Sequence, residues 1–137
     1  MVRLNNMNPV MNFTNILAIG TGAALGAWSR WGLGLIFNAV WPGFPLGTLA
    51  ANLIGGLMMG MAMGLIGMGS LDSASLRLFV TTGFLGGLTT FSAFTGESLA
   101  MLHRHEYTLA MLHACSHVFG ALLMAAIGVA FIEYIKQ

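Results

Sequence analysis

The residues best suited to chemistry gather in residues 81–94, which read TTGFLGGLTTFSAF inside a long apolar stretch. The segment combines glycines, hydroxyl side chains and two phenylalanines. Lipid cannot satisfy loose backbone groups, so a break at membrane depth must be shielded by protein or line a cavity. Such a break frees N–H groups, which bind anions, and carbonyls, which bind cations. The segment therefore predicts a place where something polar binds or passes.

Each hydroxyl and ring in this segment also has an ordinary interpretation. A Ser or Thr hydroxyl can bond back to its own helix, although clustering with glycines makes this less favoured. Phe91 and Phe94 would normally face lipid or the core. Aromatic rings, however, carry a positive edge, and edges directed into a dry pore can contact a small anion. The residue types alone leave both interpretations open.

Three further polar residues lie in apolar stretches. Arg30 fits either a snorkelling anchor at a helix end or a fixed positive charge at a vestibule. Asn52 needs hydrogen-bond partners, and these are either another helix or a passing anion. Glu97 has three possible roles, which are to cap its helix, to pair with Arg104 or to lie near an entrance.

His113 and His117 are four residues apart, so they share a helix face at a spacing that metal ligands also use. No carboxylate or cysteine completes a ligand set at helical spacing, since Cys115 points elsewhere. Packing or interhelical hydrogen bonding is therefore the favoured interpretation. No nucleophile–base pair stands out either, so we do not expect an enzyme.

The composition defines the surroundings of these residues. The 137-residue chain is 57% hydrophobic and 7% charged, whereas soluble domains carry roughly 25% charged residues. We therefore expect an integral membrane protein with the lipid bilayer as a partner. A net charge of +1 without a basic stripe gives no reason to expect nucleic acid. A single cysteine excludes an internal disulfide.

The pattern along the chain predicts one all-α domain, residues 1–137, with four transmembrane helices and a Gly-rich break in the third. Each apolar stretch has about the 20 residues that a spanning helix needs. The first is too long for a signal peptide and lacks a convincing cleavage site, so we expect it to be retained. The four predicted spans are residues 14–37, 46–68, 76–101 and 108–132.

The charges give little orientation. Arg3, Arg77 and Lys136 would lie on one side of the membrane, and Arg104 and Arg30 on or near the other. A bias of three against two is weak. Either the cytoplasmic side holds both termini or the protein inserts both ways. The second option predicts an antiparallel dimer, which also suits a chain too small to enclose much protected volume.

Small-residue patterns predict close helix contacts. Gly22 and Gly26 form one GxxxG pair, and Gly56, Gly60 and Gly64 form a double one. Such faces let helix backbones approach closely. Packing within the chain is the favoured interpretation, and a dimer interface is the alternative.

Three segments carry a family resemblance. Residues 20–31 (GTGAALGAWSRW), 45–55 (PLGTLAANLIG) and 82–92 (TGFLGGLTTFS) resemble the first three helices of the CrcB/Fluc family of fluoride channels, in order and at family spacing. Residues 117–120 agree more loosely with the fourth helix. The resemblance implies passive, fluoride-selective flow through a dual-topology, antiparallel homodimer. It also implies a bacterial inner (plasma) membrane location and a role in lowering toxic cytoplasmic fluoride.

The resemblance further implies a set of site residues. A structural Na⁺ at the dimer centre would be held by backbone carbonyls, once from each subunit, and one arginine would lie near the vestibule. The matching positions are Phe91, Phe94, Asn52, Ser92 and Thr90 for the fluoride pore, Arg30 for the vestibule, and Gly86 and Thr89 for Na⁺. The chain departs from the family where hydroxyl residues are frequent, at Ala93, Ala121 and Ala125. Without these hydroxyls the pore lining would be more apolar. This predicts slower conduction, or a path for the ion that relies more on backbone groups, Asn52 and Ser92.

Two other classes remain as alternatives. Small four-helix multidrug exporters are also dual-topology dimers, but they need a carboxylate in the first helix, where this chain has Arg30. A non-transporting membrane assembly subunit would use its glycines for packing only. That alternative predicts that replacing Phe91 or Phe94 changes stability alone.

Overall fold

The computed structural model describes residues 12–136, and within that range it is all-helical. Arg3, which entered the charge count above, lies outside the described residues. The third predicted helix is a run of four pieces, one of them π-helical, and the other predicted helices are continuous. The elements are α1 (Phe13–Phe37), α2 (Leu46–Gly67), α3 (Ala74–Arg77), the π-helix η2 (Leu78–Leu85), α4 (Gly86–Leu88), α5 (Phe91–His103) and α6 (Tyr107–Ile135).

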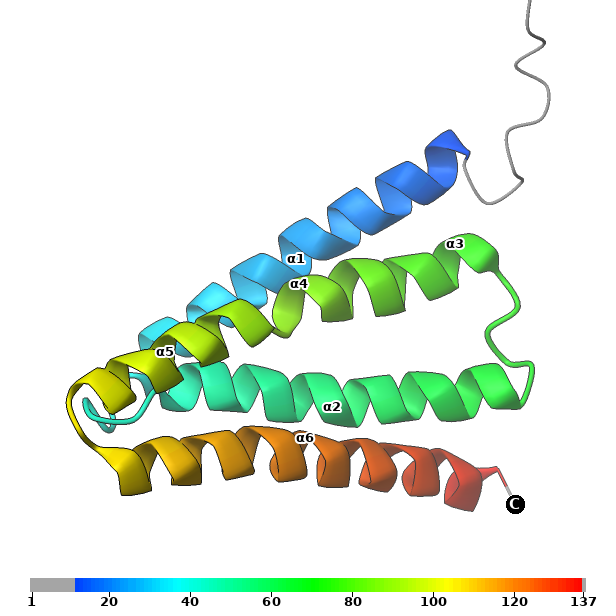
Figure 1. Ribbon diagram of the computed structural model, residues 1–137. Coiled ribbons are helices and arrows are strands. Elements are labelled where there is room, and N and C mark those ends of the chain that lie inside the picture. The colour runs from blue at the N-terminus through cyan, green and yellow to red at the C-terminus, as the bar shows by residue number, and fades with distance from the viewer. Residues whose placement is uncertain (1–11, 137) are drawn as a thin grey trace, which may run out of the picture.

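α1 and the broken run form one packed pair, α2 and α6 form the other, and the broken run lies between α1 and α2 (Figure 1). α2 and α6 lie side by side along most of their length. α1 packs against η2 and α4, while α5 continues past the break and packs against α6. A short turn then joins α5 to α6 at one end of the molecule. The break therefore lies close to three other helices, because α1 and α2 contact α4 on one side of it and α6 contacts α5 on the other.

Side-chain caps define where the pieces of the third run begin. The Ser73 hydroxyl accepts a hydrogen bond from the Leu76 amide (3.3 Å) before α3. The Thr90 hydroxyl accepts one from the Ala93 amide (3.2 Å) before α5. Each cap satisfies one of the amides that a helix start leaves free. The Thr90 cap therefore stabilises the start of α5 at Phe91.

Three helical runs in the described range are long and apolar enough to cross a bilayer. They are Leu46–Gly67, the broken run Ala74–His103 and Tyr107–Ile135. α1 is as long, but Arg30 and its flanking aromatic and small residues make it less apolar, and it is not among the three. The chain is thus an all-helical membrane protein.

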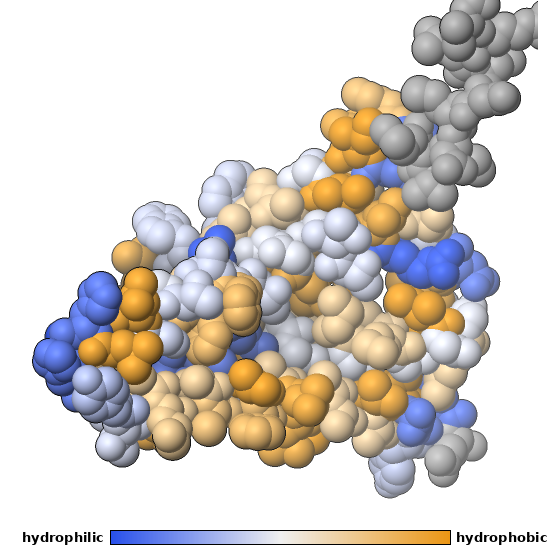
Figure 2. All heavy atoms as spheres, in the orientation of Figure 1, coloured by the Kyte–Doolittle hydropathy of each residue, from blue (hydrophilic) through white to orange (hydrophobic). Residues whose placement is uncertain are grey.

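The surface matches this conclusion. Apolar side chains cover the middle of the face shown in Figure 2, and hydrophilic ones gather at the end where α5 turns into α6. The buried core is small. One cluster is built on Ala51, Leu85 and Leu88, and another on Phe44, Met101 and Ala110. Most large apolar side chains therefore face outwards, towards lipid or another chain.

Glycines make the close contacts between helices. A Cβ added at Gly56 would lie 2.6 Å from the Ala121 carbonyl oxygen, and one at Gly60 would collide with the Ala125 carbonyl. Gly22 is equally tight, since its Cβ would lie 2.6 Å from the Phe79 carbonyl of η2. The prediction of packing within the chain is confirmed at these glycines.

Candidate functional site

The third run breaks at two threonines rather than at its glycines. α4 ends at Leu88, and Thr89 and Thr90 are extended, with φ/ψ of −79°/155° and −152°/126°. The preceding glycines are helical, and two of them pack closely on α1, because a Cβ at Gly83 would lie 2.8 Å from the Ile19 carbonyl oxygen and one at Gly87 would collide with the Ala23 carbonyl. The predicted break therefore exists, but the glycines fit the helix against α1 and the threonines open it.

Asn52 of α2 is hydrogen-bonded to both backbone groups of Thr90. Its Oδ1 accepts from the Thr90 amide at 2.8 Å, and its Nδ2 donates to the Thr90 carbonyl at 3.1 Å. Nδ2 also lies 2.9 Å from Nδ1 of His117 on α6. One amide side chain therefore connects three helical segments and satisfies the backbone at the break.

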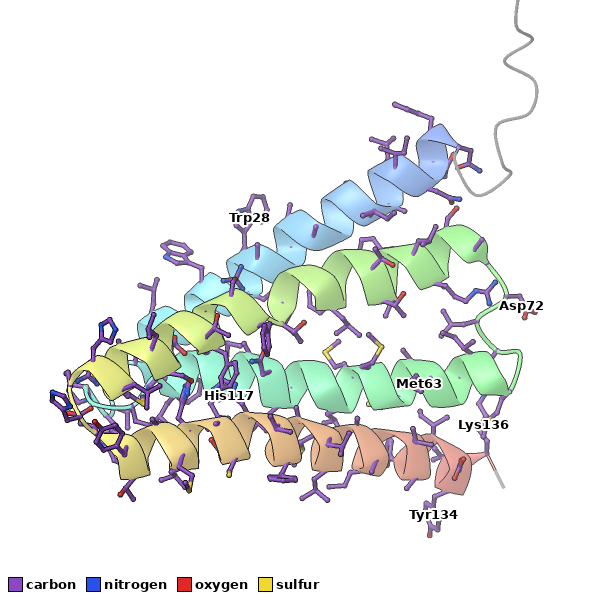
Figure 3. The ribbon with its side chains drawn as sticks, in the orientation of Figure 1. Trp28, Met63, Asp72, His117, Tyr134 and Lys136 are labelled. Carbon is purple, nitrogen blue, oxygen red and sulfur yellow. The ribbon has the colours of Figure 1, made fainter. Side chains whose placement is uncertain are left out.

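The two bonds to Thr90 determine which nitrogen of His117 carries the proton. They fix Asn52 with Nδ2 towards His117, so Nδ1 of a neutral His117 must accept and its proton lies on Nε2. His117 is buried and reaches from α6 towards α2 and α5 (Figure 3). Its Nε2 has no hydrogen-bond partner in the described part of the chain. A buried N–H donor is thus left free beside the break.

Phe94 packs among these polar groups. Its ring stacks on that of His113 (centroids 5.3 Å apart, planes at 19°) and lies 4.9 Å from that of His117. Phe91 contacts Phe94 at 5.4 Å but is 75% exposed. The centroids of the two imidazoles are only 4.4 Å apart, so both lie on the same side of Phe94, where His113 covers one ring face.

These residues line one open groove of about 490 Å³. The groove brings together Asn52, Thr90, Phe91, Phe94 and His117. Its other walls are mostly apolar and include Thr89 and two of the positions where the chain lacks a hydroxyl, Ala121 and Ala125. The groove is therefore largely apolar, with polar groups at the break.

Glu97 lies on the other side of the imidazoles. Its Oε1 accepts from the Thr48 hydroxyl at 2.5 Å, and its Oε2 is 3.4 Å from His113 Nε2. Pairing with Arg104 was one option for Glu97, and it is wrong because Arg104 bonds Glu106 at 2.8 Å. Glu97 also lines a second pocket of about 220 Å³, with Arg104 at its wall. The carboxylate therefore lies between this pocket and the imidazoles.

The remaining predicted site residues surround the break without joining the groove's polar cluster. Arg30 Nε donates to the Gly87 carbonyl at 3.2 Å, so its side chain lies along the broken run rather than free at an interface. Ser92 is exposed and lies 3.2 Å from the Thr90 hydroxyl. Thr89 donates its hydroxyl to the Leu85 carbonyl at 2.8 Å.

Ser98 is the contributor that sequence reasoning missed. His113 is fully buried, and its Nδ1 lies 3.0 Å from the Ser98 hydroxyl of α5. Interhelical hydrogen bonding was the favoured role for both histidines, and it is confirmed. The carboxylate near them went unnoticed because Glu97 comes from a different helix, where spacing along α6 gives no signal.

A broken apolar run, held by an amide at membrane depth and flanked by rings and imidazoles, defines a multi-pass helical membrane protein with a polar site inside the bilayer. Residues 17–129 match the family described as CrcB-like protein, Camphor Resistance (CrcB). The chain is 52% identical over 124 residues to the "Fluoride-specific ion channel FluC" of Aromatoleum aromaticum, covering 90% of this chain and 95% of that protein.

Two further relatives carry the same name. That of Cupriavidus pinatubonensis is 52% identical over 112 residues, covering 82% of this chain and 89% of the relative. That of Nitrosospira multiformis is 44% identical over 127 residues, covering 93% and 99%. The chain belongs to the CrcB family, and the resemblance inferred from its first three helices is confirmed.

Proposed function

We propose that the protein is a fluoride-selective channel that lets F⁻ flow passively across the membrane. Similarity to proteins named fluoride-specific ion channels over nearly the whole chain supports this function. The observation that carries it is the Asn52–Thr90–His117 arrangement beside Phe94, because it places hydrogen-bond donors and ring edges in an otherwise apolar passage. In a bacterium, such a channel would release fluoride and lower its toxicity.

The chemistry follows from the hydration of fluoride. A small, strongly hydrated anion enters a narrow pore only if donors replace its water, and it leaves only if no donor holds it too tightly. Asn52 Nδ2 is already shared between two acceptors, whereas the His117 Nε2–H is free. We therefore assign the main donor role to His117, positioned by Asn52, with the edges of Phe94 and Phe91 as weaker contacts.

The functional unit we propose is an antiparallel homodimer. Large apolar side chains along α1 and α6 face outwards, and the groove is open on one side, so a single chain does not enclose a passage. A second copy in the opposite orientation would close it, consistent with the weak charge bias. In this assembly α1 would also span the membrane, with Arg30 bonded to the broken run, in a bacterial inner membrane.

A structural Na⁺ fits the geometry of the break. The amide that would close the next helical turn on the Gly86 carbonyl is that of Thr90, and it donates to Asn52 instead. The Gly86 carbonyl therefore loses its helical partner, and Thr89 is extended. Carbonyl oxygens suit hard cations such as Na⁺. Gly86 and Thr89 of each copy would hold the ion, and it would fix the two breaks against each other.

The decisive experiment is anion efflux from liposomes that contain the purified protein, with a potassium ionophore as shunt and fluoride and chloride electrodes as readout. We expect rapid fluoride loss with chloride retained. Retention of fluoride by folded, Na⁺-supplied protein would contradict the channel function. Efflux of both anions would contradict selectivity. A monomeric mass in detergent or bilayer would contradict the dimer.

A further inference from the structure

Glu97, His113 and His117 form a three-residue cluster between two helices. Glu97 comes from α5, and the histidines lie one turn apart on α6. Each residue offers one potential ligand atom, and these atoms lie within 4.8 Å of one another. Both histidines are at least nine-tenths buried, and Glu97 is partly buried. The cluster lies next to Phe94 but uses side chains that the channel function does not require together.

Each member of the cluster is held through one polar atom and has a second polar atom that makes no hydrogen bond. Thr48 bonds Glu97 Oε1, Ser98 lies beside His113 Nδ1, and Asn52 beside His117 Nδ1. Glu97 Oε2, His113 Nε2 and His117 Nε2 are buried and make no hydrogen bond among the described residues, although Glu97 Oε2 and His113 Nε2 lie 3.4 Å apart. Buried polar atoms without partners are rare and costly. Supporting bonds on the outer atoms, with inner atoms free, are also what metal ligands show.

We propose that Glu97, His113 and His117 form a binding site for a borderline divalent cation such as Zn²⁺, and that its occupation blocks the anion pathway. Two imidazoles and one carboxylate are a common zinc ligand set, with water as the fourth ligand. The site lies between the pocket at Arg104 and the groove at Phe94. A bound cation there fills the space that a permeating anion needs and traps the anion by charge. The blocking effect rests on the proposed function, and the metal site does not.

The hydrogen bonds of Asn52 make metal binding and the break interdependent. His117 can bind a metal through Nε2 only if its proton moves to Nδ1, where Asn52 now donates. Asn52 must then turn its oxygen to His117 and leave the Thr90 amide. Metal binding is therefore expected to loosen the break, and the bonds to Thr90 are expected to weaken metal binding. Moderate affinity and reversible inhibition follow.

The first test measures metal binding directly on purified, metal-free protein. We would titrate ZnCl₂ by calorimetry and record the visible spectrum of Co²⁺ as a geometric probe. We expect one Zn²⁺ per chain and a tetrahedral Co²⁺ spectrum. Mutation of a residue that only hydrogen-bonds to a metal ligand changes metal affinity by roughly 10- to 100-fold. Loss of a ligand itself should cost at least as much, so His113→Gln and Glu97→Gln should each weaken Zn²⁺ binding at least about tenfold. Absence of Zn²⁺ binding, or unchanged affinity in both variants, would overturn the site.

A matched control separates the cluster from other histidines. His103 is the last residue of α5 and His105 lies in the turn after it, and both are exposed. The double variant His103→Gln/His105→Gln therefore removes surface imidazoles without touching the cluster. It should bind Zn²⁺ as the unaltered protein does. Loss of binding in this control would place the metal on the turn. Circular dichroism and gel filtration would confirm that each variant is folded before its affinity is interpreted.

A third variant tests the role of Asn52. Asn52→Asp supplies a carboxylate that accepts from His117 Nδ1–H, which leaves Nε2 free for metal. Tighter Zn²⁺ binding is expected, by about tenfold or more, and weaker binding would overturn the participation of His117. In liposomes, micromolar Zn²⁺ should slow fluoride efflux, with less effect in His113→Gln relative to its own metal-free rate. Zn²⁺ binding without inhibition would overturn the block alone, and absence of any efflux would count against the channel function instead.

Discussion

The side chain of Asn52 bonds both the N–H and the C=O of Thr90, at 2.8 and 3.1 Å. Because Thr90 is extended between two helices, its N–H and C=O have no helical hydrogen-bond partners. Inside a membrane no water is present to replace those partners. The amide therefore stabilises the break by replacing the lost turn. Because the same amide fixes His117, the geometry of the break and the presentation of a hydrogen-bond donor depend on one residue.

Replacing Asn52 by Ala should reduce both stability and transport. Each buried backbone group left without a partner costs about 1–3 kcal/mol, and the donor geometry of His117 is lost. A loss of this size in a contact to the passing ion corresponds to roughly 10- to 100-fold slower efflux. Thermal unfolding in detergent and fluoride efflux would measure the two effects. Thr21→Ala, which removes an exposed hydroxyl bonded to its own helix, is the control and should change neither.

Gly60→Ala should destabilise the pair of helices α2 and α6. The added Cβ meets the Ala125 carbonyl, which belongs to the backbone and cannot move aside without shifting α6. Gly67 in the same helix has nothing within 4 Å of an added Cβ, so Gly67→Ala should be neutral or stabilise by up to about 1 kcal/mol. Unfolding midpoints of the two variants provide the comparison. Equal unfolding midpoints for the two variants would contradict close packing of α2 on α6 at Gly60.

Phe94→Leu should slow fluoride efflux more than it lowers stability. Leucine keeps most of the apolar contact but removes the ring edge, and the ring stacking on His113 contributes only about 0.5–1.5 kcal/mol. Phe119→Leu on the exposed face of α6 is the matched control, and its efflux should be unchanged. If efflux in Phe94→Leu falls only as far as stability falls, the non-transporting alternative gains support.

Ala121→Ser should speed efflux. Ala121 lines the groove, and a hydroxyl there adds a donor where the wall is apolar. One additional hydrogen bond is worth about 1 kcal/mol, which corresponds to roughly fivefold in rate. Ala126→Ser, on the exposed side of the same helix, tests whether any added hydroxyl has this effect. Slower or unchanged efflux in Ala121→Ser would show that the hydroxyl bonds back to α6 instead.

Sequence reasoning was most successful where the signal is local. Long apolar stretches predicted the helices, and the Gly/Thr-rich segment predicted a break. The exact position of the break was not predictable, because it depends on Asn52, which lies 38 residues from Thr90 along the chain. The π-helical stretch Leu78–Leu85 was missed for a similar reason, since it is part of a segment fitted closely against α1.

The cluster of Glu97, His113 and His117 shows the same limit more clearly. Helical spacing joined the two histidines, but only the packing of α5 on α6 brings the carboxylate to them. Likewise, Glu97 lies in α5 and Arg104 directly follows that helix, yet Arg104 pairs with Glu106 in the turn instead. Pairings between side chains of different helices depend on how the helices pack, and spacing along one sequence does not reveal that packing.

The partners of Asn52 also determine an order of events during synthesis. When α2 leaves the ribosome, its amide has no partner yet, because Thr90 and His117 follow 38 and 65 residues later. The nascent hairpin of α1 and α2 therefore carries an unsatisfied polar group into the membrane and gains nothing from settling early. The full set of Asn52 hydrogen bonds therefore forms only after α6 has been made as far as His117.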